Sequence, residues 1–183
     1  MTIDEQLAEN MRKSFEAGLS SRLRRASQAK LQRVIPAHWF ASAASECAGM
    51  YIAGYFYGAI SIAQAYVEAL SGFLSNFHPV GAKNDPDKRW NLLYEKRVIS
   101  VEVRDAALDI FSDRNDFHHL NRQVEQDFAK LEERALICLN HLHTIEAEVF
   151  SYSFDNGSIV LEKPELWPSV GDGLSNINLR KLW

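Results

Sequence analysis

Arginine, asparagine and histidine side chains gather in the segment RNDFHH, residues 114–119. A histidine titrates near neutral pH and exchanges protons, whereas an arginine stays charged and holds phosphate oxygens. Arg114 and His119 therefore suit the cleavage of a phosphodiester. RNA brings its own nucleophile, the 2′-hydroxyl, so a general base and a phosphate-binding cation are sufficient without a metal ion or another cofactor. The expected product end is a 2′,3′-cyclic phosphate.

Polar residues beside Arg114 and His119 can support this chemistry. Asn115 can hydrogen-bond the arginine or the phosphate, and Asp113 or Asp116 can orient a histidine. The alternative is a polar turn between two helices, in which Arg114 pairs with Asp113 or Asp116 and the histidines line the turn.

The spacing of the cluster restricts how its side chains can converge. On a continuous helix, Arg114 and His119 point about 140° apart, whereas Arg114 and His118 share a face. Either the chain turns at 115–117, or two copies of the segment meet across a symmetric dimer. His118 is therefore an auxiliary candidate. Glu68, at the edge of an apolar helical stripe, is either simply exposed or orients the cluster.

A second group of candidates lies in a basic segment near the N-terminus. No acidic residue occurs between Glu16 and Glu46, so one helical stretch is distinctly positive. This stretch is either a solvated helix face or a surface that contacts phosphates or an acidic partner. Its candidate nucleic-acid-binding residues are Arg22, Arg24, Arg25, Lys30 and Arg33.

Bulk composition describes an ordinary globular chain. The 183 residues are 46% hydrophobic and 24% charged, with a formal net charge of −4, so any basic surface must be local. Cys47 and Cys138 lie far apart in apolar patterns, which predicts neither a disulfide framework nor a metal site. The uncharged stretch 47–67 is diluted by glycine and tyrosine, which favours one buried central helix over a membrane span. Without a recognisable targeting segment, we expect a cytoplasmic protein.

Helical periodicity dominates the chain up to residue 150. Apolar residues at four-residue steps predict a first helix ending near Gly18, and a basic second helix ending near Pro36. The stripe between 56 and 77 predicts the central helix, and 87–111 predicts one bent helix or two short ones. A heptad seam over 124–149 must pack against another helix, either in this chain or in a second subunit.

The pattern changes after residue 150. An Asn-Gly pair between short β-compatible runs predicts a hairpin, followed by a loop-like arm. We therefore predict an all-α fold, an up-and-down bundle of four to five main helices with a short C-terminal β-hairpin or arm. Residues 1–150 form a single domain on which the basic helices of 1–35 pack, and 151–183 form a hairpin and tail, not a separate domain.

One family resemblance follows from these residues. Arg114, the polar Asn115 and His119, just before the last long helix of a small α-bundle, resemble the motif of the HEPN superfamily. The stretch YGAISIAQAYVEALSGFL, residues 57–74, also looks like the long central helix of such domains. The likeness covers roughly 38–150 and leaves the basic helices and the C-terminal arm unexplained.

The resemblance implies a homodimeric, metal-independent endoribonuclease of the kind found in toxin–antitoxin and phage-defence systems. In this interpretation, Arg114 stabilises the phosphate of an RNA substrate, and His119 acts as base or acid at the subunit interface. An antitoxin or another partner protein is then expected. The competing hypothesis is a non-catalytic helical dimer that binds a nucleotide, a nucleic acid or a partner protein through the heptad seam, the basic helix and the C-terminal arm.

Overall fold

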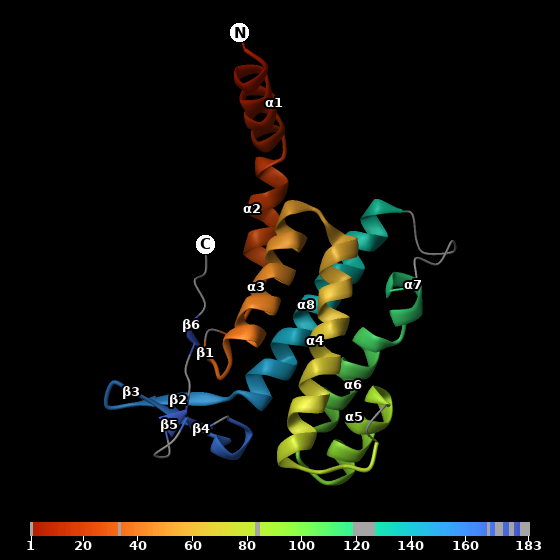
Figure 1. Ribbon diagram of the computed structural model, residues 1–183, viewed down its shortest axis with the longest axis vertical. Helices are drawn as coiled ribbons and strands as arrows, with labels where there is room; N and C mark the ends of the chain where they lie inside the picture. The colour runs from red at the N-terminus through yellow and green to blue at the C-terminus, as the bar shows by residue number, and fades with distance from the viewer. Residues whose placement is uncertain are drawn as a thin grey trace.

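The computed structural model describes residues 2–32, 34–82, 85–118 and 127–167, together with the backbone of three short strands at 169–170, 174–175 and 178–179. Of His118, only the backbone is described. Most of the described chain is helical, and short antiparallel strand pairs lie toward the C-terminus (Figure 1). The predicted all-α bundle with a C-terminal hairpin is therefore confirmed.

Two helices precede the bundle, and one of them extends away from it. α1 (Ile3–Ala17) projects from the body of the molecule, whereas α2 (Leu19–Gln28) runs alongside its first helix (Figure 1). Gly18 separates the two helices, as its sequence position predicted. The helices of the bundle are α3 (His38–Ala53), α4 (Phe56–Phe77), α5 (Pro86–Glu95), α6 (Val101–Phe111), the short α7 (Arg114–His118) and α8 (Phe128–Val149).

The core is built around α4, which contacts α3, α5, α6, α7 and α8. The heptad seam of α8 faces this core, since Leu142, Ile145 and Val149 are fully buried. The neighbours of the seam are α4 and α6 of the same chain. From Ala135 to Val149 the seam is therefore buried within the chain and offers no docking surface for a second subunit, whereas Phe128 at its start is 59% exposed.

The uncharged stretch 47–67 is not the single helix that its composition predicted. Gly54, at a φ of 92°, ends α3 in the left-handed conformation, and the chain reverses into α4. Close contact across this hairpin depends on Gly58, because a Cβ there would lie 2.6 Å from Sδ of Met50. No helix in the described ranges is long and apolar enough to span a membrane.

The C-terminal segment forms the predicted hairpin. β2 (Tyr152–Asp155) pairs antiparallel with β3 (Ser158–Leu161), and Asn156 and Gly157 between them both have a positive φ, as the turn of a two-residue hairpin requires. A 3₁₀ turn, η1 (Pro164–Leu166), then leads to Trp167, which is buried against Phe150 with ring centres 5.8 Å apart.

The tail beyond Trp167 returns to the start of the bundle. β4 (Ser169–Val170) pairs with β5 (Leu174–Ser175), and β6 (Asn178–Leu179) pairs antiparallel with β1 (Val34–Ile35). β1 belongs to the connection between α2 and α3. The backbone of the tail thus joins two distant segments of the chain, which sequence periodicity did not indicate.

We predict that Gly54→Ala destabilises the fold by about 1–2 kcal/mol, because alanine must adopt the left-handed backbone conformation that glycine tolerates. Its new Cβ would also lie 3.1 Å from a terminal guanidinium nitrogen of Arg25. Urea unfolding followed by circular dichroism measures the change. The matched control is Gly72→Ala within α4, where a Cβ meets no atom within 4 Å. Equal stability of the two variants would contradict this account of the turn.

Candidate active site

The candidate site lies at the corner where α6 ends and α7 begins. Arg114, the first residue of α7, forms an ion pair of 3.0 Å with Glu68 of α4, and its guanidinium lies 5.3 Å from the ring centre of Phe111. The side chains of Arg114 and Glu68 remain 36% and 39% exposed. The structure therefore places Glu68 beside Arg114 and leaves part of the guanidinium open to solvent.

An open pocket of about 370 Å³ adjoins this guanidinium. It lies between the start of α5 and the α6–α7 corner, with Asn115 exposed at its rim. Asp85 at one wall caps α5, since its carboxylate accepts a hydrogen bond of 3.0 Å from the backbone of Lys88. The lining residues are Asp85, Pro86, Asp87, Phe111, Ser112, Arg114 and Asn115.

Carboxylates outnumber cations around this pocket. Burial raises the pKa of Asp87, the nearby charge of Asp85 raises it further, and Arg114 opposes both effects. The pair with Glu68 adds a third carboxylate next to Arg114. An anionic ligand at Arg114 must therefore displace or offset the charge of these carboxylates, which weakens its binding.

The short helix α7 is fixed to α4 through its backbone. The Tyr57 hydroxyl lies 3.1 Å from the carbonyl oxygens of both Asp116 and Phe117, to which it donates. Phe117 is buried, and its ring centre lies 5.0 Å from that of Tyr57. Asp116 thus supports the site through its backbone carbonyl, and its predicted role of orienting a histidine stays untested.

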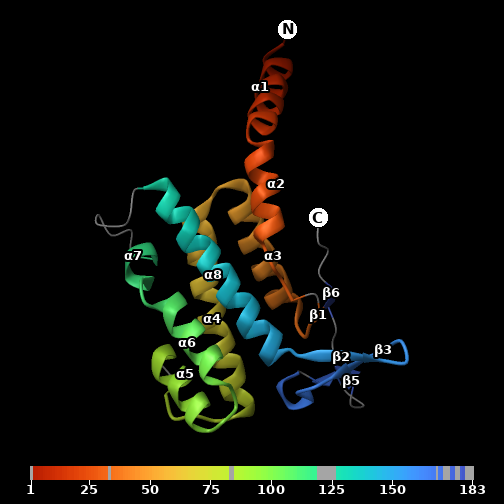
Figure 2. The same cartoon turned by 180° about the vertical axis from the view of Figure 1, so that it is seen from behind.

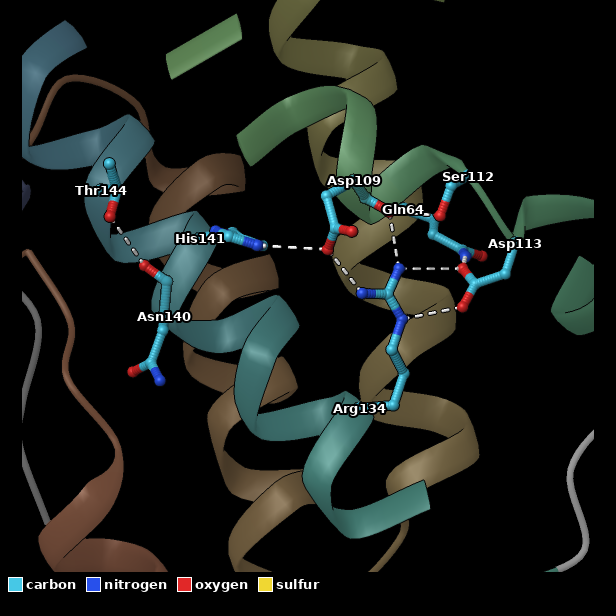
Figure 3. Close-up of polar contacts among 8 residues, drawn as sticks. All are labelled: Gln64, Asp109, Ser112, Asp113, Arg134, Asn140, His141 and Thr144. Carbon is cyan, nitrogen blue, oxygen red and sulfur yellow. Dashed lines mark hydrogen bonds and ion pairs between the residues drawn. The ribbon is translucent and has the colours of Figure 1, made fainter. Parts of the chain in front are cut away.

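Asp113 points away from the pocket, toward α8. Its carboxylate accepts hydrogen bonds of 2.8 Å and 3.2 Å from Arg134 and one of 2.8 Å from Gln64 (Figure 3). Arg134 also binds the carboxylate and the carbonyl of Asp109, each at 2.6 Å, and His141 lies 3.1 Å from the same Asp109 carboxylate. Burial alone would lower the pKa of Arg134, but the two aspartates hold it above its usual range. Asp113 therefore anchors the α6–α7 corner, and its predicted role of orienting a histidine stays a prediction.

Sequence reasoning singled out Glu68 on α4 but missed the row of polar side chains to which it belongs. Tyr57, Gln64, Glu68 and Ser71 recur at intervals of three, four and seven residues and form one face of the helix, here called the polar seam of α4. Tyr57 binds α7, Gln64 binds Asp113, and Glu68 binds Arg114. Ser71 accepts a 2.9 Å hydrogen bond from Arg89 of α5. The same spacing rule that identified the apolar stripe would have found this seam.

The histidines of the motif are not placed. His119 lies outside the described residues, and no side-chain position is described for His118. A buried thiol lies near the Arg134 network, but burial raises the pKa of Cys138 to about 12, so it is not a thiolate nucleophile at neutral pH. Among the described side chains, no group of three or more histidines, cysteines, aspartates or glutamates is arranged to hold a metal ion.

The basic segment lies away from the pocket, and two of its arginines form contacts that hold the fold together. Arg25 is buried, and its guanidinium binds both carboxylate oxygens of Glu132 on α8 at 3.2 Å and 3.1 Å. Arg24 pairs with the same carboxylate. These hydrogen bonds, from Arg25 above all, lower the pKa of Glu132 although burial opposes them.

Arg25 thus docks α2 onto the bundle, and its predicted contact with a nucleic acid stays a prediction. Arg22 stacks on Phe15, Lys30 is exposed, and Arg33 lies outside the described residues. From behind, α2 and α7 again lie at opposite edges of the bundle (Figure 2). The basic segment and the Arg114 pocket therefore do not form one continuous cleft within the chain.

No family model, curated protein or solved structure matches this chain. The resemblance to HEPN proteins therefore depends on the motif and on the order of the helices.

We predict that Arg134→Gln lowers the free energy of unfolding by about 2–3 kcal/mol, because it leaves the Asp109 and Asp113 carboxylates without their guanidinium partner. Urea unfolding measures the loss. The control is Arg12→Gln on α1, where the arginine is 65% exposed and pairs with Glu9 one turn away; its effect should stay within about 0.5 kcal/mol. A loss at Arg134 no larger than that of the control would show that the network does not hold the corner.

Proposed function

We propose that this chain is a metal-independent endoribonuclease of HEPN type, in which Arg114 binds the scissile phosphate and His119 exchanges protons. One observation carries the proposal: the guanidinium of Arg114 faces an open pocket and is held by a ring contact and a half-exposed ion pair. Such an arginine is positioned in advance and can still exchange its anionic partner.

A phosphate can replace the Glu68 carboxylate at modest cost. An ion pair exposed to this degree contributes about 0–1 kcal/mol, whereas a phosphate can accept two parallel hydrogen bonds from the planar guanidinium. Nε of Arg114 is buried and has no hydrogen-bond partner among the described residues. Contact with Phe111 keeps the plane of the guanidinium in place during the exchange.

The neighbouring side chains fit the rest of a phosphodiester site. Asn115, exposed at the pocket rim, can donate its amide to a second phosphate oxygen. In the proposed reaction, His119 removes the proton of the 2′-hydroxyl while the O2′–P bond forms and the P–O5′ bond breaks. The departing 5′-oxygen takes a proton, which leaves a 2′,3′-cyclic phosphate and a 5′-hydroxyl.

The resemblance supplies the wider setting of this proposal. It implies a homodimer in which two copies of the motif face each other, so that one histidine acts as base and the other as acid. It also implies a cytoplasmic role in a toxin–antitoxin or phage-defence system, with an antitoxin or another partner protein that controls the activity.

A non-catalytic binding protein is the competing function, and the charge of the pocket favours it. Asp85 and Asp87 line the same pocket as Arg114, and both carboxylates repel an RNA backbone. A ligand that offers a cationic or amino group beside its phosphate would suit this mixed lining better than a polyphosphate chain.

We predict that the purified protein cleaves single-stranded RNA in EDTA and leaves 2′,3′-cyclic phosphate ends. Arg114→Ala should lower the rate about 100-fold or more, because it removes the cation that stabilises the developing phosphate charge. His119→Ala should lower it similarly. Product ends are identified by mass spectrometry. Arg12→Gln, on the exposed face of α1, is the control and should cleave like the wild type. An inert wild type, or an active Arg114→Ala variant, would sink the nuclease proposal.

The Glu68 ion pair allows a second test, which measures ligand binding and does not require RNA cleavage. Glu68→Gln removes the carboxylate that competes with phosphate, so the dissociation constant for a 2′-deoxy oligonucleotide should fall about two- to fivefold. Fluorescence anisotropy measures the binding. Glu102→Gln, at an exposed position of α6, is the matched charge control and should leave the constant unchanged. Weaker binding by Glu68→Gln would mean that Glu68 holds Arg114 in place rather than competing with the ligand.

A further inference from the structure

An uncovered apolar surface runs along the N-terminal helices. No residue of α1 is buried. Large apolar side chains recur every fourth residue along α1 and α2, and their exposed fractions range from 39% at Leu19 to 86% at Ile3. Here they are called the N-terminal stripe, which consists of Ile3, Leu7, Met11, Phe15, Leu19 and Leu23.

A helix in this situation needs a partner. α1 has 15 residues, and isolated helices of that length are marginal in water even with favourable sequences. Its local support is a capping box between Thr2 and Glu5 and the pairing of Glu9 with Arg12 and Lys13. Contacts of this kind contribute little compared with burial of an apolar face. A partner that covers the stripe would therefore stabilise α1.

The charges at the two ends of the N-terminal stripe are complementary to each other in an antiparallel pair of identical chains. The first turn of α1 carries Asp4 and Glu5, and the positive charges of Arg12, Lys13 and Arg22 follow toward the other end of the stripe. The guanidinium of Arg22 lies 4.6 Å from the ring centre of Phe15, beside Gly18. A positive group thus sits at the flank of the stripe one helix length away from the acidic turn.

We propose that α1 pairs antiparallel with α1 of a second copy of this chain. With the two-fold axis at Met11, Leu7 lies opposite the partner's Phe15, because Leu7, Met11 and Phe15 share one face of α1. The same register brings Asp4 opposite the partner's Gly18, where the guanidinium of the partner's Arg22 lies. Two surface hollows lie along this path and offer space for the incoming side chains.

The first hollow, of about 470 Å³, is lined by Asn10, Met11, Ser14, Phe15 and Arg22 and faces Leu7 of the second copy. The second, of about 230 Å³, lies at the junction of α1, α2 and α3, beside Leu19. Its lining is predominantly apolar and consists of Phe15, Leu19, Arg22, Leu23, Ala26, Gly49, Ile52 and Ala53.

Charge also disfavours two other arrangements, a parallel pair of helices and contact with an anionic membrane. A parallel pair would place Asp4 against Asp4 and Arg22 against Arg22, and like charges at such positions are unfavourable. Along the whole stripe the charges nearly balance, so no excess of positive charge selects an anionic membrane. The acidic residues of 3–28 are Asp4, Glu5, Glu9 and Glu16, and the basic ones are Arg12, Lys13, Arg22, Arg24 and Arg25. α1 also lies apart from α7 in both views (Figures 1 and 2), so the α1 pairing uses a different surface from the motif-facing homodimer of the proposed function and is tested separately from it.

The register is tested by cross-linking through single cysteines in the full chain. Met11→Cys lies on the proposed axis, so mild oxidation should join most of the protein into disulfide-linked dimers. Leu7→Cys should remain unlinked, because its two copies would be separated by about 12 Å along the helices, beyond the reach of a disulfide. Both native cysteines, Cys47 and Cys138, are buried and serve as an internal control.

Charge exchange tests the same pairing without cross-linking. Asp4→Lys and Arg22→Glu, each alone, should raise the dimer dissociation constant about tenfold, and the double variant should return to within about threefold of the wild type. Sedimentation velocity measures the constants. Circular dichroism checks that the bundle, which buries no residue of α1, stays folded in every variant.

Three results would overturn the proposal. The first is a wild-type chain that stays monomeric up to about 100 µM. The second is equal cross-linking of Leu7→Cys and Met11→Cys, and the third is a double charge variant weaker than both single ones. Binding of the monomer to phosphatidylcholine vesicles, lost in Leu7→Glu, would assign the N-terminal stripe to a membrane surface instead.

Discussion

The polar seam of α4 is the constraint on which the arrangement of the site depends. α4 is the most surrounded helix of the bundle, and a polar side chain on such a helix must find hydrogen-bond partners. Tyr57 finds them in the backbone of α7, Gln64 in Asp113, and Ser71 in Arg89. These contacts decide where α5 and α7 can lie, and Arg134 locks the corner between α6 and α7 from the opposite side.

This arrangement explains the character of the Arg114 pocket. The guanidinium is neither enclosed by several carboxylate contacts, as the partly buried Arg134 is, nor free in solvent. It is held by Glu68 and Phe111 at the edge of the bundle, where its partner can be exchanged. The carboxylates of Asp85 and Asp87 line the same pocket, so the positive charge of Arg114 is partly offset there.

The N-terminal helices contain both a residue that docks them onto the bundle and a row of exposed apolar side chains. Arg25 docks α2 through Glu132 and approaches the ring of Phe56, with 4.8 Å between guanidinium carbon and ring centre. The apolar side chains of the N-terminal stripe remain outside. A stretch that looks uniformly basic in sequence thus contains one buried anchor and a surface whose apolar and charged residues suit a helical partner.

The sequence by itself determined the helical class of the fold, the break at Gly18 and the Asn-Gly hairpin, because apolar periodicity and turn residues act over a few neighbouring positions. It also singled out Arg114, Asn115 and Glu68. It missed the reversal at Gly54 that separates α3 from α4. Only the tertiary structure decided that Asp113 faces Arg134, that Arg25 is buried and that the seam of α8 packs inside its own chain. Hydrogen-bond partners such as Glu132 and Arg25 are more than a hundred residues apart, and no local pattern specifies which distant helix satisfies a given charge.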